Sequence, residues 1–148
     1  MTAVTTILQA KKKEDATVHS IAPTATVLEA LQRMADKHIG ALLVMEGKQI
    51  VGILTERDYA RKIALLGRTS VTTLVRDVMT PDVMYVHPRQ TSEECMALMT
   101  QNRLRHLPVV DNGELLGLIS IGDLVKDIIS QQQFIIEQLE HYISGQHA

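Results

Sequence analysis

Two heptads, GILTERD at residues 52–58 and GLISIGD at residues 117–123, share one pattern and indicate an internal repeat. Each contains a glycine, two aliphatic residues, a hydroxyl residue, two variable residues and an aspartate. The shift of 65 residues that relates them also aligns residues 17–63 with 82–128 without a gap, and ten of the 47 pairs are identical. A duplicated supersecondary unit is the simplest cause, and two copies favour a pseudo-twofold pair over an open solenoid.

Each copy predicts the element order β-α-β-β-α. An extended piece ends before a proline, because proline lacks an amide donor and biases the preceding residue toward extended backbone. A threonine then begins an amphipathic helix, with a glutamate three residues later at capping-box spacing. Two aliphatic runs around a polar turn predict a buried hairpin, and a second helix follows the aspartate. The corresponding residues are Val18–Ile21, Pro23, Thr26, Glu29, 39–45 and 50–54 in the first copy, and Val83–Val86, Pro88, Thr91, Glu94, 104–110 and 115–119 in the second.

The fold prediction is therefore α+β, with mixed helices and strands: tandem β-α-β-β-α repeats packed as a pseudo-twofold pair, flanked by an N-terminal segment and a C-terminal helix. The expected boundaries are an N-terminal segment at 1–16, repeat 1 at 17–65, a linker at 66–81, repeat 2 at 82–130 and a helical extension at 131–148. Apolar residues near helical period in the extension predict a stripe for a partner or for the module itself.

Composition excludes several classes of protein. A length of 148 residues and 45% hydrophobic content are typical of one compact globular domain. A net charge of −2 argues against nucleic acid as a partner, and no apolar span is long enough to cross a membrane. The single cysteine, Cys95, fits a reducing compartment, so we expect a cytoplasmic protein.

The chemistry of the heptads suits a ribose-phosphate. The glycine allows a ligand to approach the strand, and Thr55 and Ser120 stand at the turn into the second helix. Asp58 and Asp123 at the start of that helix could accept hydrogen bonds from a ribose diol, beside free amides that favour phosphate. The same residues also form a capping box, and the two interpretations are compatible.

Other conspicuous residues have plain structural interpretations. Lys11, Lys12 and Lys13 are expected in a solvated turn, Cys95 as a small packed helix residue, and His106 as a structural or phosphate-facing histidine. The methionines at 34, 96 and 99 fall on helical stripes and are expected in the core. No metal-site spacing and no recognised catalytic motif is present, so we expect neither metal nor catalysis.

Over residues 14–128 the chain resembles a CBS domain pair, the module named after cystathionine β-synthase, and in particular a small stand-alone CBS protein of the bacterial signal-transduction type. The resemblance rests on the doubled G-h-x-[ST]-x-x-D heptad at its repeat spacing. It implies two clefts between the copies that hold adenosine ligands such as AMP, ADP, ATP, NAD or S-adenosylmethionine, and modules that pair as dimers.

The resemblance also implies which residues line the two clefts. The cleft closed by Ser120 and Asp123 would take Arg105, His106 and Leu118 from repeat 2, and Thr17, His19, Ile39 and Gly40 from repeat 1. The other, closed by Thr55 and Asp58, would take Ile53 and Arg57 from repeat 1, and Asp82, Met84, Leu104 and Arg105 from repeat 2. Gly40 and Ala41 stand where repeat 2 has Arg105 and His106, so we expect the two clefts to differ in phosphate number or ligand.

The expected function is a regulatory adenosine-nucleotide-binding module that senses energy or redox state and signals to a regulated partner protein. We expect a homodimer, and neither nucleic acid nor a membrane as a partner. Two alternatives stay open: a structural dimerisation scaffold without ligand and, with less support, an enzyme that acts on nucleotides. The sequence does not distinguish between AMP, ATP, NAD and S-adenosylmethionine as the ligand.

Overall fold

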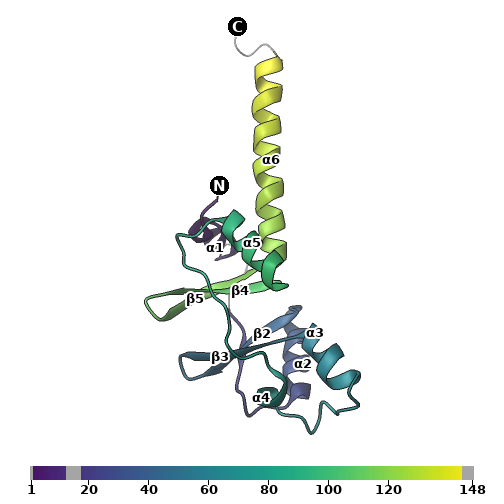
Figure 1. Cartoon of the computed structure of the whole chain (residues 1–148). Coiled ribbons are helices and arrows are strands. Elements are labelled where there is room, and N and C mark those ends of the chain that lie inside the picture. Colours follow the sequence, from purple (N-terminus) through teal and green to yellow (C-terminus); the bar gives the residue numbers. More distant parts are fainter. Residues whose placement is uncertain (1, 13–17, 145–148) are drawn as a thin grey trace. The chain divides into compact units, whose positions relative to one another are not determined.

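The computed structural model describes residues 2–12 and 18–144, and the chain divides into two compact units (Figure 1). One unit spans residues 18–84. The other joins residues 85–144 with the N-terminal residues 2–12, so the start of the chain packs with the second repeat.

The first unit holds a three-stranded sheet in the order β1-β2-β3, with β1 parallel to β2 and β2 antiparallel to β3. The sheet and its helices pack around a core that includes Leu42, Leu54 and Ile63. The elements of this unit are β1 (Ser20–Ile21), α2 (Val27–Lys37), β2 (Ala41–Glu46), β3 (Gln49–Thr55), α3 (Glu56–Asp58), the π-helix η1 (Tyr59–Ala64) and α4 (Val75–Val78).

The second unit has the antiparallel hairpin β4–β5, and Val86 adds a single parallel bridge to Val109 where the sequence predicted an extended piece. Its elements are α1 (Val4–Lys12), α5 (Ser92–Asn102), β4 (His106–Asp111), β5 (Glu114–Ser120) and α6 (Ile121–Ile143). In Figure 1, α6 extends well beyond the hairpin of its own unit, so the predicted helical extension is confirmed through Ile143. No helix in residues 2–12 and 18–144 has the length and apolar character needed to cross a bilayer.

The shift of 65 residues holds for the structure as it does for the sequence. The bounds of α2, β2 and β3 become those of α5, β4 and β5 when 65 is added, and both hairpins carry an irregularity at the same position. The predicted caps are confirmed, because Thr26 and Thr91 each accept a hydrogen bond at 3.2 Å from the amide three residues later. Each helix then ends at a left-handed residue, His38 and Arg103.

A second internal repeat, which our sequence analysis missed, relates residues 2–8 to 73–79 by a shift of 71. Residues 2–8 bond to the turn before α5, and residues 73–79 bond to the turn before α2, through equivalent backbone pairs. Val4 N donates to Gln90 O, and Val75 N donates to Ala25 O, both at 2.8 Å. The N-terminal segment thus packs on repeat 2 in the same way as residues 73–79 of the linker pack on repeat 1.

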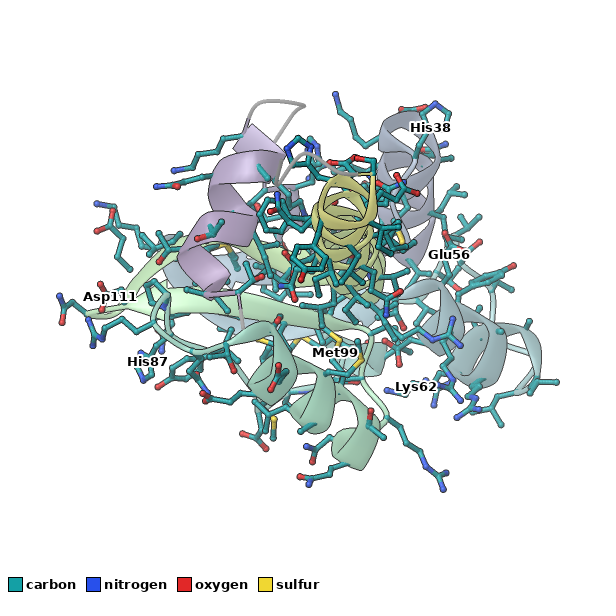
Figure 2. The ribbon with its side chains drawn as sticks, turned by 90° about the horizontal axis from the view of Figure 1, so that it is seen from above. His38, Glu56, Lys62, His87, Met99 and Asp111 are labelled. Atoms are coloured by element: carbon teal, nitrogen blue, oxygen red, sulfur yellow. The ribbon has the colours of Figure 1, made fainter. Side chains whose placement is uncertain are left out.

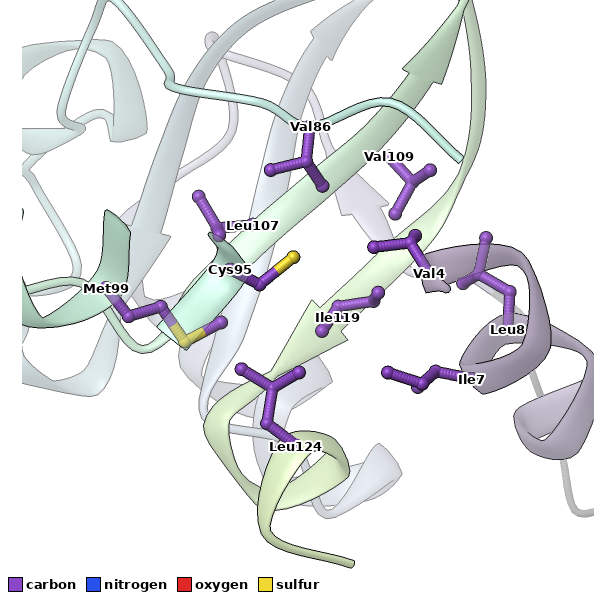
Figure 3. Close-up of a cluster of buried hydrophobic side chains, with 10 residues drawn as sticks. All are labelled: Val4, Ile7, Leu8, Val86, Cys95, Met99, Leu107, Val109, Ile119 and Leu124. Carbon is purple, nitrogen blue, oxygen red and sulfur yellow. The ribbon is translucent and has the colours of Figure 1, made fainter. Parts of the chain in front are cut away.

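Each unit has its own hydrophobic core. Figure 3 shows the second core, in which Val4, Ile7 and Leu8 of α1 lie among side chains of α5, β4, β5 and α6. The predictions for the sulfur-containing residues are confirmed: Cys95, Met34 and Met99 are buried, and Met96 packs against the core while partly buried. Burial raises the pKa of the Cys95 thiol to about 11, so this thiol stays protonated and unreactive at neutral pH.

Candidate functional site

In both heptads the strand runs directly into the first turn of a helix, and each aspartate closes a full capping box. In repeat 1, Asp58 Oδ2 accepts from Thr55 N at 2.9 Å and from Thr55 Oγ1 at 3.1 Å, while Asp58 N donates to Thr55 Oγ1 at 3.2 Å. In repeat 2, Asp123 Oδ2 accepts from Ser120 N at 2.8 Å, and Asp123 N donates to Ser120 Oγ at 3.2 Å. The structural interpretation of the heptads as caps is therefore confirmed.

A lysine neutralises each of these carboxylates. Lys62, labelled in Figure 2, lies one turn after Asp58, and its Nζ lies 3.3 Å from Asp58 Oδ1 and donates to Val78 O at 2.9 Å. In repeat 2, Lys11 Nζ lies 2.9 Å from Asp123 Oδ2 and donates to Leu118 O at 2.7 Å. The prediction of a solvated turn was wrong for Lys11, because α1 packs on repeat 2 and directs this amine to the heptad. Lys13 lies outside the described residues.

The two lysines occupy positions that are not equivalent in the two repeats. The position of Lys11 corresponds, under the shift of 71, to Asp82 in the other segment. The position of Lys62 corresponds, under the shift of 65, to Asp127. Each repeat thus has one lysine and one acidic residue at this pair of positions, but in opposite places. The paired patterns at 2–8 and 73–79, T-x-V-x-x-[IV]-[LM], are the sequence signal that could have located Lys11.

The two carboxylates differ in the oxygens they use. Asp58 uses Oδ2 for Thr55 and Oδ1 for Lys62. The contacts of Asp123 with the described residues, by contrast, all end on Oδ2. Both side chains are 14% exposed. Within the described part of the chain, Asp123 Oδ1 is therefore left for a further donor, whereas Asp58 Oδ1 already pairs with Lys62 and offers only its remaining lone pair.

The second repeat also carries more positive charge beside its heptad. Arg105 is exposed, and its carbonyl accepts from Ile121 N at 2.9 Å, which holds the loop before β4 against the start of α6. His106 is half-buried at the first position of β4. Burial, followed by the nearby Lys11 and Arg105, lowers the pKa of His106, and Asp123 opposes this shift. His106 is thus held largely neutral at pH 7.

The first repeat has an acidic residue at the equivalent place. Gly40 corresponds to Arg105, and its carbonyl accepts from Glu56 N at 3.1 Å, the counterpart of the bond to Ile121. A Cβ added to Gly40 would stand 3.6 Å from Glu56 Oε1, so this carboxylate lies beside the glycine. Figure 2 labels Glu56 at the first turn of α3. A phosphate beside Gly40 would meet a negative charge where repeat 2 offers a guanidinium.

The heptad glycines do not leave room for a ligand, and this expectation was wrong. A Cβ on Gly52 would stand 2.5 Å from Met79 Sδ, and one on Gly117 would stand 2.7 Å from Leu8 Cδ2. The glycines instead admit the two segments related by the shift of 71. Thr80 also pairs with both backbone groups of Ile53, at 3.0 and 2.9 Å, so the backbone of Ile53 is already engaged.

The remaining predicted residues lie near the heptads of their own units or outside the described chain. Thr17 lies outside the described residues. His19 is half-buried before β1, Ile39 and Gly40 are half-buried before β2, Ala41 is buried at its first position, Arg57 is exposed on α3, Asp82 and Met84 are exposed after α4, and Leu104 is half-buried before β4. Within each unit the structure brings the heptad and the loop before the hairpin together. The grouping of residues from both repeats into one cleft stays a prediction.

Across residues 2–12 and 18–144, no group of His, Cys, Asp and Glu could hold a metal ion.

Comparison with known proteins identifies the two repeats. The family model of the CBS domain matches residues 15–65 and 75–130. The solved structure of a CBS-domain protein from Burkholderia ambifaria is 53% identical, with a TM-score of 0.85, and the match covers 88% of this chain and 96% of that one.

Two curated relatives agree. YhcV of Bacillus subtilis, a CBS domain-containing protein, is 33% identical over 78% of this chain and 81% of its own length. CBSX3 of Arabidopsis thaliana, a mitochondrial CBS domain-containing protein, is 39% identical over 81% of this chain. The match spans 61% of the length of CBSX3, less than two thirds of that protein.

Proposed function

Because the chain belongs to the CBS domain family, a family of regulatory modules, we propose that it binds an adenosine nucleotide and signals the bound state to a partner protein. The nucleotide would report energy or redox state. Its ribose would bind at the heptad aspartates, and the family resemblance assigns the base to residues of the opposite repeat.

The observation that carries the proposal is the state of Asp123. The cap and Lys11 orient its side chain through Oδ2, so Oδ1 keeps its capacity to accept. Pre-organised acceptors bind a ligand with less loss of side-chain freedom than mobile ones. We propose that Asp123 Oδ1 accepts a ribose hydroxyl and that this site is the stronger of the two.

The charges beside the heptads support the same order of affinity. Each heptad aspartate already has one lysine, so the difference lies in the other charges: Arg105 lies near His106 in the second unit, whereas Glu56 lies beside Gly40 in the first unit. A phosphate would be attracted in the first case and repelled in the second. We therefore propose that Asp58 forms the weaker site, although Arg57 in the same heptad supplies one exposed cation.

AMP is the first ligand to test. CBSX2, which was solved in complex with AMP, has a TM-score of 0.70 with this chain at 22% identity, over 88% of this chain and 98% of its own. Such a likeness concerns the fold alone. ADP, ATP, NAD and S-adenosylmethionine belong in the same panel because the heptad chemistry addresses only the ribose and phosphate.

Calorimetric titration of two matched variants, Asp123→Asn and Asp58→Asn, tests the proposal. Asparagine keeps an acceptor for the cap but removes the charge. A hydrogen bond to a charged group contributes about 1.5–3 kcal/mol, so Asp123→Asn should weaken binding roughly 10- to 150-fold. Asp58→Asn should leave the tighter site unchanged. Unchanged affinity in both variants, with unfolding temperatures near that of the wild type, would contradict the assigned sites.

A structural scaffold without ligand is the second candidate, and the lysine pairs favour it. Lys11 and Lys62 already neutralise both carboxylates, so the caps have a stabilising role that needs no nucleotide. Thermal unfolding separates the two functions, because a ligand that binds only the folded state raises the unfolding temperature. A scaffold would show no shift with any of the panel at millimolar concentration.

The partner and the wider assembly are part of the proposal. We propose a homodimer, a regulated partner protein and a regulatory rather than catalytic role; release of product from a bound nucleotide would contradict the last of these. The cytoplasmic location stays a prediction.

A further inference from the structure

The C-terminal helix α6 carries an apolar surface that its own unit does not cover. Side chains of residues 132–143 are exposed on every face of the helix. Gln131 ties the helix to its unit, because its amide contacts Thr2 Oγ1 and also donates to Asp127 at 2.9 Å. An isolated helix of about twelve residues is marginal in water.

The apolar residues of α6 follow a seven-residue repeat. With Ile121 at position d, the d positions hold Ile121, Ile128, Ile135 and Tyr142, and the a positions hold Val125, Gln132 and Leu139. Position e adds Ile129, Ile136 and Ile143. Exposure of the apolar members ranges from 39% for Ile121 to 77% for Ile143, so the stripe faces solvent along the whole helix. A repeat of this period is the pattern by which α-helices pair in coiled coils.

The ionisable residues of α6 avoid this stripe. Asp123, Lys126, Asp127, Glu137, Glu140 and His141 all fall at positions b, c and f, the outer face of such a pair. The g positions hold Leu124, Gln131 and Gln138, so no charge flanks the seam on either side. Two identical helices can therefore approach without the like-charge repulsion that charged flanks would create.

The one polar residue at the seam favours an identical partner. Gln132 is an a-position residue at the midpoint of the helix, with eleven residues on each side between Ile121 and Ile143. A glutamine amide carries both a donor and an acceptor. A second copy that brings the same residue to the same level satisfies both groups, and a single polar residue at an a position is a known means of setting register.

We propose that the stripe of α6 at positions a, d and e is an interface between copies of this chain, with the helices paired about Gln132. This interface goes beyond nucleotide binding and does not depend on it.

Disulfide trapping on the full chain tests the interface at one defined point. Gln132→Cys places a thiol in the seam, and Ser130→Cys places one at position f on the outer face; the native Cys95 is fully buried and stays silent. Paired helices hold two seam thiols at high effective concentration, so the interchain disulfide of the Gln132→Cys variant should form at least about tenfold faster. Equal rates for the two variants would overturn the interface.

A second pair of substitutions separates a true seam from chance collision. Ile135→Glu in the Gln132→Cys background should reduce the rate to that of the Ser130→Cys control, because it places a charged carboxylate in the apolar seam of each copy. Phe134→Glu in the same background should leave the rate unchanged, since Phe134 is 62% exposed at position c. Continued fast disulfide formation with Ile135→Glu would also overturn the proposal, whereas nucleotide affinity should be unaffected in either case.

Discussion

The contact between α1 and the second heptad gives a sharp test of how the N-terminal segment stabilises its unit. Lys11→Met removes the amine and keeps the length and apolar stem of the side chain. It removes the 2.9 Å ion pair with Asp123 and the 2.7 Å hydrogen bond to Leu118 O. Asp123 keeps its cap, so the change isolates the lysine contacts.

The size of the effect follows from burial. The side chains of Lys11 and Asp123 are 29% and 14% exposed, so the pair is neither buried nor fully solvated. Exposed pairs contribute about 0.2–1 kcal/mol and well-formed hydrogen bonds to charged groups about 1.5–3 kcal/mol. Because solvent partly screens this pair, we expect a value between these two ranges. Lys11→Met should lower the free energy of unfolding by about 1–2 kcal/mol. In a chain of this size that corresponds to an unfolding temperature lower by roughly 5 °C.

Urea unfolding followed by circular dichroism measures the change, with Lys12→Met as the matched control because Lys12 is exposed on the same helix. A double-mutant cycle with Asp123→Asn then isolates the pairwise interaction, which should be of the order of 1 kcal/mol. Equal destabilisation by Lys11→Met and Lys12→Met, or a cycle without coupling, would show that the amine of Lys11 does not anchor α1.

Three further predictions concern the same unit. The pKa of His106 is lowered from its ordinary value of 6.5, so on acidification the unfolded chain takes up a proton at this residue before the folded chain does. The free energy of unfolding should therefore fall as the pH drops below 6.5, and it should fall less in His106→Gln. Gly117→Ala should cost about 1–3 kcal/mol in denaturant unfolding, because its Cβ would meet Leu8 at 2.7 Å, whereas Gly122→Ala should cost nothing. Cys95, with its pKa of about 11, should be alkylated at pH 8 far more slowly in the native protein than in urea, and equal rates would contradict its burial.

Much of the fold could be predicted because its signals are local or periodic. Thr26 and Thr91 cap their helices three residues before Glu29 and Glu94, a relation that lies within one turn. The hairpins follow from aliphatic runs around short turns, and the shift of 65 residues predicts the same hairpin in both repeats. The capping boxes of the heptads belong to the same class. The chemistry of the heptads nominated their own site residues, whereas the other site residues could be nominated only through family resemblance.

By itself the amino-acid sequence determined the two repeats, their helices and hairpins, and the seven-residue pattern of α6, since neighbours along the chain create these features. Only the tertiary structure decided that residues 2–8 pack on the second repeat, that Lys11 meets Asp123 from 112 positions away, and that Leu8 rather than a ligand fills the space at Gly117. Composition and spacing do not predict such contacts. The contacts form only when segments remote in sequence pack in one core, where the Lys11 amine comes close to the Asp123 carboxylate and the Leu118 carbonyl.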